Sequence, residues 1–503
     1  MDEGQERIGR VVLVGGILFY VVLQTFFFPT YYSQADEGCY VSMAFVFANG
    51  RISGEGLDVN LYRFSRVDGR LVGEYDCGMG WLLVPFTVFG PRALFAFNIL
   101  MHLAGFVVFY LLLRRLELHP AFSWLYLLDP TLWYHSRNIV NDLPAGVFFL
   151  VGFYFLLVAG RAVLAAGLCF ALAIFTRPAS VVFVAPFLLA WTVAAFVAAH
   201  SRPEGPTGRR EVWKKIGMLA LGAAPPLIAL VLYNVTVMHS LLGISQARLA
   251  GGQAPFSLTH VPFNLLRYGV SLNVLYPGMA VLFFLYRGPL RWPLVVAGLV
   301  GGFFYMTYVD WGLGGAVQFG SVESLVLGPR YLEVVLPLVL VTYAWWADRF
   351  ARRFGKPVWI AYGIAVLLLL TGDAAMTALH QRHMDQAAYF RNELFGNTPK
   401  GALILMDEPV RTRISSDVKR SRKLLTVFPF EEDPAKSVAG LDDLLARQGE
   451  AYVPELFTGG EIAAPPRAVR DRDIFLARHP REVILDVERQ GWRLKITRVK
   501  PAN

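Results

Sequence analysis

Residues 7–28 read RIGRVVLVGGILFYVVLQTFFF, two arginines followed by a run without a charged residue. A helix needs about 20 apolar residues to cross the hydrocarbon core of a bilayer. The run meets that length, and no small-residue cleavage site of the kind that ends a signal peptide follows it. We therefore expect residues 9–28 to form the first membrane helix.

The composition of the whole chain agrees with this reading. Apolar residues make up 55% of its 503 residues and charged residues only 17%, whereas soluble domains are about 25% charged. This balance excludes a soluble globular enzyme, a disordered chain and a coiled coil. The net charge of +9 is attributed to anchoring loops, because no motif for DNA or RNA binding accompanies it. We predict a polytopic membrane protein without a nucleic-acid partner.

About eleven apolar segments are candidates for membrane helices. They cover residues 9–28, 92–113, 120–135, 143–160, 162–176, 179–198, 216–233, 276–287, 293–309, 331–347 and 358–378. With a cytoplasmic N-terminus, basic pairs such as Arg114-Arg115 and Arg352-Arg353 fall in inner loops, as the positive-inside rule requires. We predict a multi-pass protein of the plasma (inner) membrane in that orientation.

The chain divides into a membrane domain, residues 1–380, and a polar tail, residues 398–503. The membrane domain includes a long first outer loop, residues 29–80. The tail contains β-like runs such as ALILM and VILDV, with a helical pattern between them. We predict an all-α polytopic domain followed by a small extracytoplasmic α/β domain.

The chain has three cysteines, and two of them bracket the first outer loop. These are Cys39 and Cys77. Because both lie on the predicted oxidising side, a disulfide between them would close the loop. The alternative is two unpaired thiols. Cys169 lies in an apolar segment, where packing explains it.

Acidic residues stand at both ends of the first outer loop. Asp36 and Glu37 follow the first membrane segment, where carboxylates suit a general base or a cation ligand. Asp76 closes the loop and could face Asp36 if the loop folds back. The alternatives are solvated loop charges and, for Asp76, the N-cap of a helix.

Further polar clusters stand at the ends of later spans. In SRNIVNDLP, Arg137 and Asp142 either pair with each other or bind the phosphate and a hydroxyl of a ligand. Arg330, followed by Tyr331 and preceded at a distance by Asp310, is suited to bidentate phosphate contact. Arg177 has the same possible role, and interfacial anchoring is the alternative for both arginines. All of these clusters fall on the predicted outer face, which favours one site there over a conduit.

In order and spacing, these motifs resemble the GT-C superfamily of membrane glycosyltransferases. The similarity is to its bacterial protein O-mannosyltransferase-like and aminoarabinose-transferase-like branch, and it extends over residues 9–378. The motifs are Asp36-Glu37, Ser136-Arg137 with Asp142, Thr176-Arg177-Pro178, and Gly328-Pro329-Arg330-Tyr331.

The resemblance implies a polytopic enzyme that moves a sugar from a polyprenyl-phosphate donor to an acceptor hydroxyl, with inversion, on the outer face of the membrane. It implies that Asp36, with Glu37 beside it, is the general base or orients the acceptor, and that Asp142 is a second acidic group. It also implies that Arg330 binds the donor phosphate, helped by Arg137 or Arg177.

Some properties stay open in the sequence. The acceptor is a lipid, a glycan or a protein, and EYDCGMG at residues 74–80 replaces the Lys-Pro-Pro element of aminoarabinose transferases, which argues against lipid A. Asp36 and Glu37 offer oxygen ligands for a divalent cation. The alternative function is a transporter or flippase for a polyprenyl-linked sugar or small solute, although no internal repeat is visible.

Overall fold

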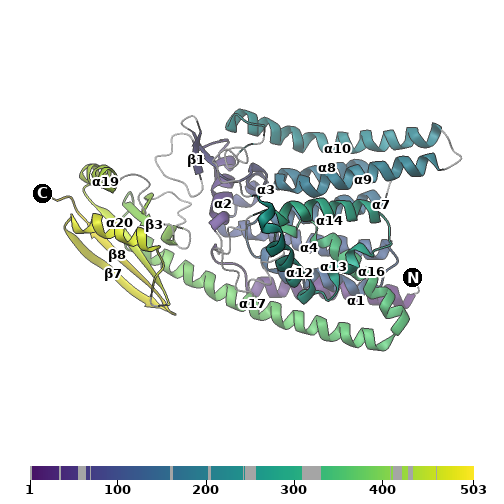
Figure 1. Cartoon of the computed structure of the whole chain (residues 1–503). Helices are drawn as coiled ribbons and strands as arrows, with labels where there is room; N and C mark the ends of the chain where they lie inside the picture. Colours follow the sequence, from purple (N-terminus) through teal and green to yellow (C-terminus); the bar gives the residue numbers. More distant parts are fainter. Residues whose placement is uncertain are drawn as a thin grey trace. The chain divides into compact units, whose positions relative to one another are not determined.

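The computed structural model describes residues 3–32, 35–54, 64–67, 70–158, 162–201, 206–241, 243, 256–308, 330–407, 409–411, 422–428, 434–459 and 461–502. The chain forms two compact units, treated separately below (Figure 1). Unit 1 comprises residues 1–28, 76–79 and 95–377, and unit 2 comprises residues 29–75, 80–94 and 378–503.

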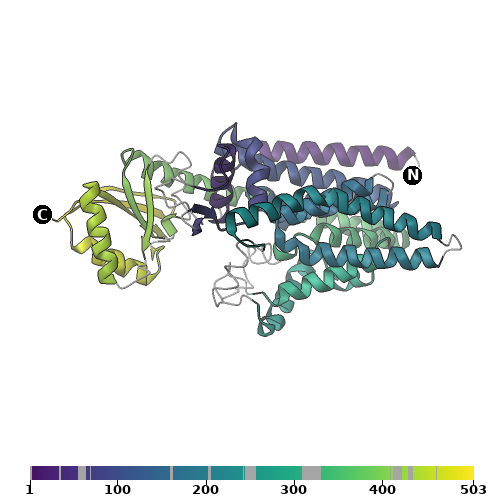
Figure 2. The same cartoon turned by 90° about the horizontal axis from the view of Figure 1, so that it is seen from above.

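Unit 1 is a bundle of apolar helices that lie side by side in both views (Figures 1 and 2). Its helices are α1 (Glu3–Phe26), α4 (Phe95–Arg115), α7 (Asp142–Val158), α8 (Ala162–Thr176), α9 (Val181–His200), α10 (Pro206–Met238), α12 (Val261–Leu275), α13 (Met279–Phe284), α14 (Arg291–Met306), α16 (Leu336–Phe354) and the first part of α17 (Lys356–Gly396).

Aromatic side chains hold the middle of this bundle together. Phe149 of α7, Phe170 of α8 and Phe187 of α9 meet in edge-to-face and tilted pairs with centroids 5.4–5.7 Å apart, the arrangement that ring quadrupoles favour. Large apolar side chains also face outward, including Leu189 and Leu221, which are 67% and 65% exposed. Lipid is the solvent in which such faces are stable.

Five helices among the described residues are long and apolar enough to cross a membrane, and four shorter apolar helices accompany them. The long ones cover Glu6–Phe26, Pro91–Arg115, Pro178–His200, Gly208–Met238 and Lys356–Gly396. The prediction of a multi-pass membrane protein is therefore confirmed.

Some predicted spans have a different form. The apolar segment at residues 120–135 is three short pieces: η2 (Pro120–Ser123), α5 (Trp124–Leu127) and α6 (Pro130–Ser136). Pro120 and Pro130 begin the first and last of these pieces, because a proline lacks a backbone N–H and is tolerated at the first position of a helix. Asp129 caps the last piece by accepting the N–H of Leu132 at 2.9 Å.

Two other boundaries also differ from the prediction. The segment at residues 276–287 is helical only over α13, and Gly278, in the left-handed conformation at φ 78°, precedes that helix. The stretch between the predicted spans 216–233 and 276–287, where no helix was predicted, contains α12. Buried polar side chains on α12, among them Asn264 and Arg267, made this helix look like a loop.

The tail in unit 2 folds around a mixed sheet with the strand order β4-β3-β5-β8-β7. Its strands are β3 (Leu403–Asp407), β4 (Lys423–Phe428), β5 (Ala451–Thr458), β7 (Arg481–Arg489) and β8 (Trp492–Val499), with β6 (Glu461–Ile462) paired to β5. Strand β3 is parallel to β4 and β5, whereas β8 is antiparallel to β5 and β7. Together with its helices, the sheet has the predicted α/β character.

Helices pack against this sheet. Leu445 of α19 (Pro434–Gln448) and Phe475 of α20 (Pro466–Ala477) share a core with Leu405. The end of α17 contacts the β7–β8 hairpin, where Phe390 stacks on Trp492 at 6.0 Å. On the hairpin surface, the guanidinium of Arg493 donates hydrogen bonds to both carboxylate oxygens of Asp486. Because these bonds favour the charged carboxylate, the pKa of Asp486 lies below its ordinary value.

The first outer loop belongs to the same unit as the tail. It contains α2 (Ala35–Ala48) and the hairpin of β1 (Phe64–Val67) and β2 (Arg70–Gly73), whereas residues 76–79 near its end lie in unit 1 with the start of α3 (Cys77–Thr87). Thr30 donates to Asp385 of α17 at 2.6 Å, and the guanidinium of Arg391 lies 5.8 Å from the ring of Tyr31. These contacts explain why the structure groups the loop with the tail, whereas the sequence placed it in the membrane domain.

The predicted disulfide between Cys39 and Cys77 is not present, and both thiols are buried. The sulfur of Cys39 lies against β2 instead, 3.4 Å from where a side chain on Gly73 would begin. Cys77 starts α3 within unit 1. The two ends of the loop meet through the hydroxyl of Tyr75, which donates to Asp36 at 2.6 Å.

Candidate active site

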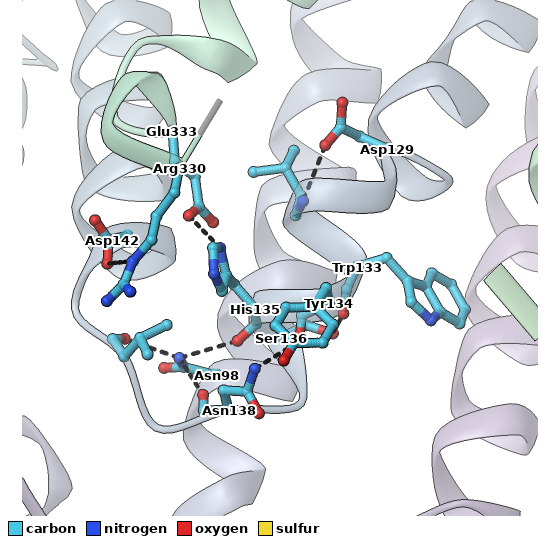
Figure 3. Close-up of polar contacts among 12 residues, drawn as sticks. Asn98, Asp129, Trp133, Tyr134, His135, Ser136, Asn138, Asp142, Arg330 and Glu333 are labelled. Carbon is cyan, nitrogen blue, oxygen red and sulfur yellow. Dashed lines mark hydrogen bonds and ion pairs between the residues drawn. The ribbon is translucent and has the colours of Figure 1, made fainter. Parts of the chain in front are cut away.

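Three of the predicted site residues meet in unit 1. Asp142, 2% exposed, is the first residue of α7, and its carboxylate forms an ion pair with Arg177. The other carboxylate oxygen lies 3.6 Å from Nε of Arg330, at the start of the short helix η6 (Arg330–Leu332) (Figure 3). Two cations from distant parts of the chain therefore share one buried anion.

Local sequence explains how these side chains are presented. An acid is favourable in the first turn of a helix, where the partial charge is positive, and α7 begins with Asp142. Helix α8 ends at Thr176, since the residue before Pro178 is driven out of helical geometry. Arg177 has φ −142° and ψ 95° accordingly. Its side chain is thereby free to turn toward α7.

Two tyrosines frame Arg177. Its guanidinium carbon lies 5.6 Å from the ring centroid of Tyr305 and 5.8 Å from that of Tyr331. The rings are stacked 5.4 Å apart at an interplanar angle of 11°. Cation–π attraction of this kind strengthens when water is excluded. The predicted site residue Tyr331 therefore lies beside Arg177.

A buried histidine and glutamate stand next to these charges. Nδ1 of His135, in the last turn of α6, lies 2.5 Å from Oε2 of Glu333, and neither side chain is exposed (Figure 3). Sequence reasoning missed both residues. Two features of the sequence could have identified them. Glu333 is a carboxylate inside the apolar segment 331–347, and His135 directly precedes the Ser136-Arg137 motif.

Asn98 of α4 supports the turn that carries Asp142. Its buried amide donates to the carbonyls of Asn138 at 2.6 Å and Val140 at 2.9 Å (Figure 3). On the other side, Gly146 of α7 lets the chain after Arg330 approach, because a Cβ there would lie 2.7 Å from the carbonyl oxygen of Glu333. The turn and η6 are therefore held at a fixed separation.

The end of the first outer loop joins this region within unit 1. A Cβ on Gly78 would lie 1.9 Å from the carbonyl oxygen of Phe175, so only glycine permits this packing of α3 on the end of α8. The contact brings Asp76, two residues earlier, close to the chain that precedes Arg177. Asp76 also lies within electrostatic range of Tyr305.

The remaining predicted site residues lie elsewhere. Arg137 is 1% exposed and donates to the carbonyl of Phe27 at 2.6 Å and to Gln24 at 3.1 Å, so it satisfies the end of α1. Asp36 and the buried Glu37 stand in the first turn of α2, in unit 2.

The metal prediction receives no support from side-chain clustering. Asp310 lies outside the described residues. Within the described part of the chain, no group of three or more histidine, cysteine or carboxylate side chains is placed to hold a metal ion.

The charges of the cluster define its chemistry. Asp142, Arg177 and Arg330 sum to one net positive charge in surroundings with little water. A guanidinium presents a planar fork of donors that matches phosphate oxygens, and its attraction for them grows as the local dielectric falls. The cluster is therefore suited to binding an anion such as a phosphodiester.

Comparisons with known proteins show a likeness of fold and none of sequence. No protein-family model and no curated protein sequence matches the chain. The structure of ArnT from Cupriavidus metallidurans bound to undecaprenyl phosphate is similar with a TM-score of 0.60 at 10% identity, and the similarity covers 96% of this chain and 97% of that one.

Two further solved structures are similar to the chain. Arabinofuranosyltransferase AftD from Mycobacteria has a TM-score of 0.52 at 14% identity, covering 99% of this chain and 42% of that one. The Archaeoglobus fulgidus oligosaccharyltransferase has a TM-score of 0.51 at 11% identity, covering 89% and 68%. The chain therefore shares the fold of these three proteins, which belong to the GT-C superfamily that its sequence motifs resemble.

Proposed function

We propose that the protein is an integral-membrane glycosyltransferase that moves a sugar from a polyprenyl-phosphate donor to an acceptor hydroxyl. The observation that carries this proposal is the meeting of Arg177 and Arg330 at the buried carboxylate of Asp142, within a GT-C fold. Undecaprenyl phosphate bound to the similar ArnT structure supports this donor class.

In the proposed reaction, Arg177 and Arg330 hold the donor phosphate, and Asp142 keeps both guanidiniums in place before the donor binds. The acceptor oxygen attacks the anomeric carbon as its bond to the phosphate oxygen breaks, and a single displacement inverts the configuration. Fixed positive charge stabilises the departing phosphate more strongly in a dry site than in water.

Asp36 is the proposed general base, and Glu37 stands beside it in the same helical turn. An acceptor hydroxyl has a very high pKa, so a nearby base must take its proton as the new bond forms. These two carboxylates are also the proposed ligands of any divalent cation. The acceptor class is a lipid, a glycan or a protein.

We also propose a topology for the protein in the plasma (inner) membrane. It has about eleven crossings, a cytoplasmic N-terminus, and the active site and tail on the outer face. The support is the asymmetry of basic residues between loops.

The proposal is tested with purified full-length protein in lipid nanodiscs and a panel of polyprenyl-phosphate sugars. We expect one donor to release polyprenyl phosphate in the presence of an acceptor, and NMR of the product to show an inverted anomeric configuration. Movement of intact lipid-linked sugar across liposomes, without its cleavage, would instead support the transporter and overturn the proposal.

Arg330→Ala is expected to raise the donor KM by about tenfold or more, since a hydrogen bond to a charged group contributes roughly 1.5–3 kcal/mol. Acceptor preference should not change. The matched control is Arg352→Ala, which removes an arginine that pairs with Asp348 at the end of α16. An unaltered donor KM in Arg330→Ala would assign Arg330 to anchoring.

A further inference from the structure

The buried pair of His135 and Glu333 has unused hydrogen-bonding atoms. The pair is joined through Nδ1 and Oε2 at 2.5 Å. Nε2 of His135 and Oε1 of Glu333, both fully buried, have no hydrogen-bond partner among the residues that the structure describes. Buried polar atoms are nearly always satisfied, because leaving them unpaired is costly. Two such atoms at one place indicate a ligand that would satisfy them.

The pair belongs to the same cluster as the proposed phosphate-binding arginines. Glu333 lies on the chain just after Arg330, and its N–H donates to the carbonyl of Arg330 at 3.1 Å. His135 acts electrostatically on Asp142, and both Asp142 and Arg177 act on Glu333. Figure 3 shows the Glu333 carboxylate directed at the imidazole, close to Arg330 and Asp142. A phosphate held by the arginines would therefore lie near this imidazole.

The charges of the donor and of the leaving group suggest what the pair does. A polyprenyl-phosphate sugar is a phosphodiester with one negative charge, and the net positive charge of Asp142, Arg177 and Arg330 balances it. When the sugar leaves, the phosphate becomes a monoester that can carry a second negative charge. The leaving phosphate therefore needs a further hydrogen-bond donor, and the Nε2–H of an imidazole is one.

We propose that His135 binds the departing phosphate through Nε2 and that Glu333 is the positioning residue that orients the imidazole through Nδ1. As the bond from the anomeric carbon breaks, its electron pair stays on the phosphate oxygen, and the Nε2–H of His135 donates a hydrogen bond to the phosphate while keeping its proton. The acceptor proton goes to the separate general base. A carboxylate behind a histidine fixes the orientation of the ring.

This inference rests on the proposed function, and two probes test it with full-length protein in nanodiscs. Undecaprenyl phosphate represents the leaving group, and its methyl ester represents a phosphodiester with one charge. We expect His135→Gln to weaken binding of undecaprenyl phosphate about tenfold and binding of the ester less than about threefold. Glu333→Gln keeps a side-chain oxygen for Nδ1 of His135 but removes the carboxylate charge. It should therefore lower the ratio of the two affinities, for undecaprenyl phosphate over its methyl ester, by a smaller factor than His135→Gln.

His102→Gln is the matched control. Like His135, His102 is fully buried in unit 1 with one paired ring nitrogen, since its Nε2 lies 3.1 Å from the carbonyl of Leu127. Unlike His135, it stacks between the rings of Tyr20 and Tyr126 and not against the charged cluster. A general loss of packing would weaken binding of both probes equally, in this variant and in His135→Gln, and would overturn the inference. Glu333→Gln provides the selectivity measurement if His135→Gln does not fold.

Failure of the inference is distinguishable from failure of the proposed function. If the unmodified protein binds neither probe, the proposed function fails. If it binds both, and the ratio of the two affinities is the same in His135→Gln, only the role of His135 is refuted.

Discussion

Asp36→Asn is expected to lower the rate of sugar transfer about 1000-fold, since a positioned general base contributes roughly 100- to 10,000-fold. Asparagine cannot take the acceptor proton. It retains a side-chain oxygen for the hydroxyl of Tyr75, which donates to Asp36 at 2.6 Å. Folding should therefore be intact. The measurement is the initial rate of polyprenyl phosphate release, beside the thermal unfolding of the same sample.

Tyr75→Phe is the control for this experiment. It removes the hydrogen bond to Asp36 and leaves the carboxylate in place, so transfer should fall by much less than in Asp36→Asn. Near-normal transfer by Asp36→Asn would remove Asp36 from the chemistry, and Glu37, its neighbour in the first turn of α2, would become the next candidate.

Asp142→Ala is expected to lower the free energy of unfolding by about 3–5 kcal/mol, the usual effect of removing one partner from a buried ion pair. The variant leaves the Arg177 guanidinium, whose side chain is only 8% exposed, without its carboxylate, and it also removes the anion near Arg330. The measurement is reversible denaturation in mixed micelles, compared with the unmodified protein.

Two variants sharpen this measurement. Combining Asp142→Ala with Arg177→Met should recover a large part of the loss, because it removes the buried charge that was left uncompensated. Asp486→Ala breaks the surface pair with Arg493 on the tail hairpin and should change stability little. If the double variant is as unstable as the sum of both single changes, the pair is not energetically coupled.

Helices in long uncharged runs were predictable, whereas broken ones were not. Helix α1 follows from an uncharged run that meets the thickness of a bilayer. The segment at residues 120–135 is as apolar as a spanning helix. Its average hydropathy therefore predicts one helix, although the segment contains two prolines. Asp129-Pro130 was nevertheless a readable start signal, an N-cap followed by proline at the first helical position.

The candidate site was predictable in its residue types and less so in its partners. Asp142, Arg177 and Arg330 come from motifs far apart in sequence, and the fold brings them together. Arg137 is nearer to Asp142 in the sequence, yet it turns toward the end of α1. Proximity along a chain does not determine which way a side chain points at the end of a short helix.

His135 and Glu333 were harder to find, because each looks ordinary alone. A histidine in an apolar segment usually packs in the core, and an acid at the start of a helix is a common stabilising feature. Only their contact, across 198 positions of sequence, identifies them as a pair.

The link between the first outer loop and α17 has a consequence for building chimeric proteins. Thr30 and Asp385 are 355 positions apart, yet they share a hydrogen bond inside unit 2. A graft that exchanged the tail alone would separate side chains that are matched to each other. The segments to exchange together are residues 29–75, 80–94 and 378–503, which form unit 2. The recombination breakpoint before the tail therefore belongs inside α17, between Thr377 and Ala378, and not at the start of the sheet.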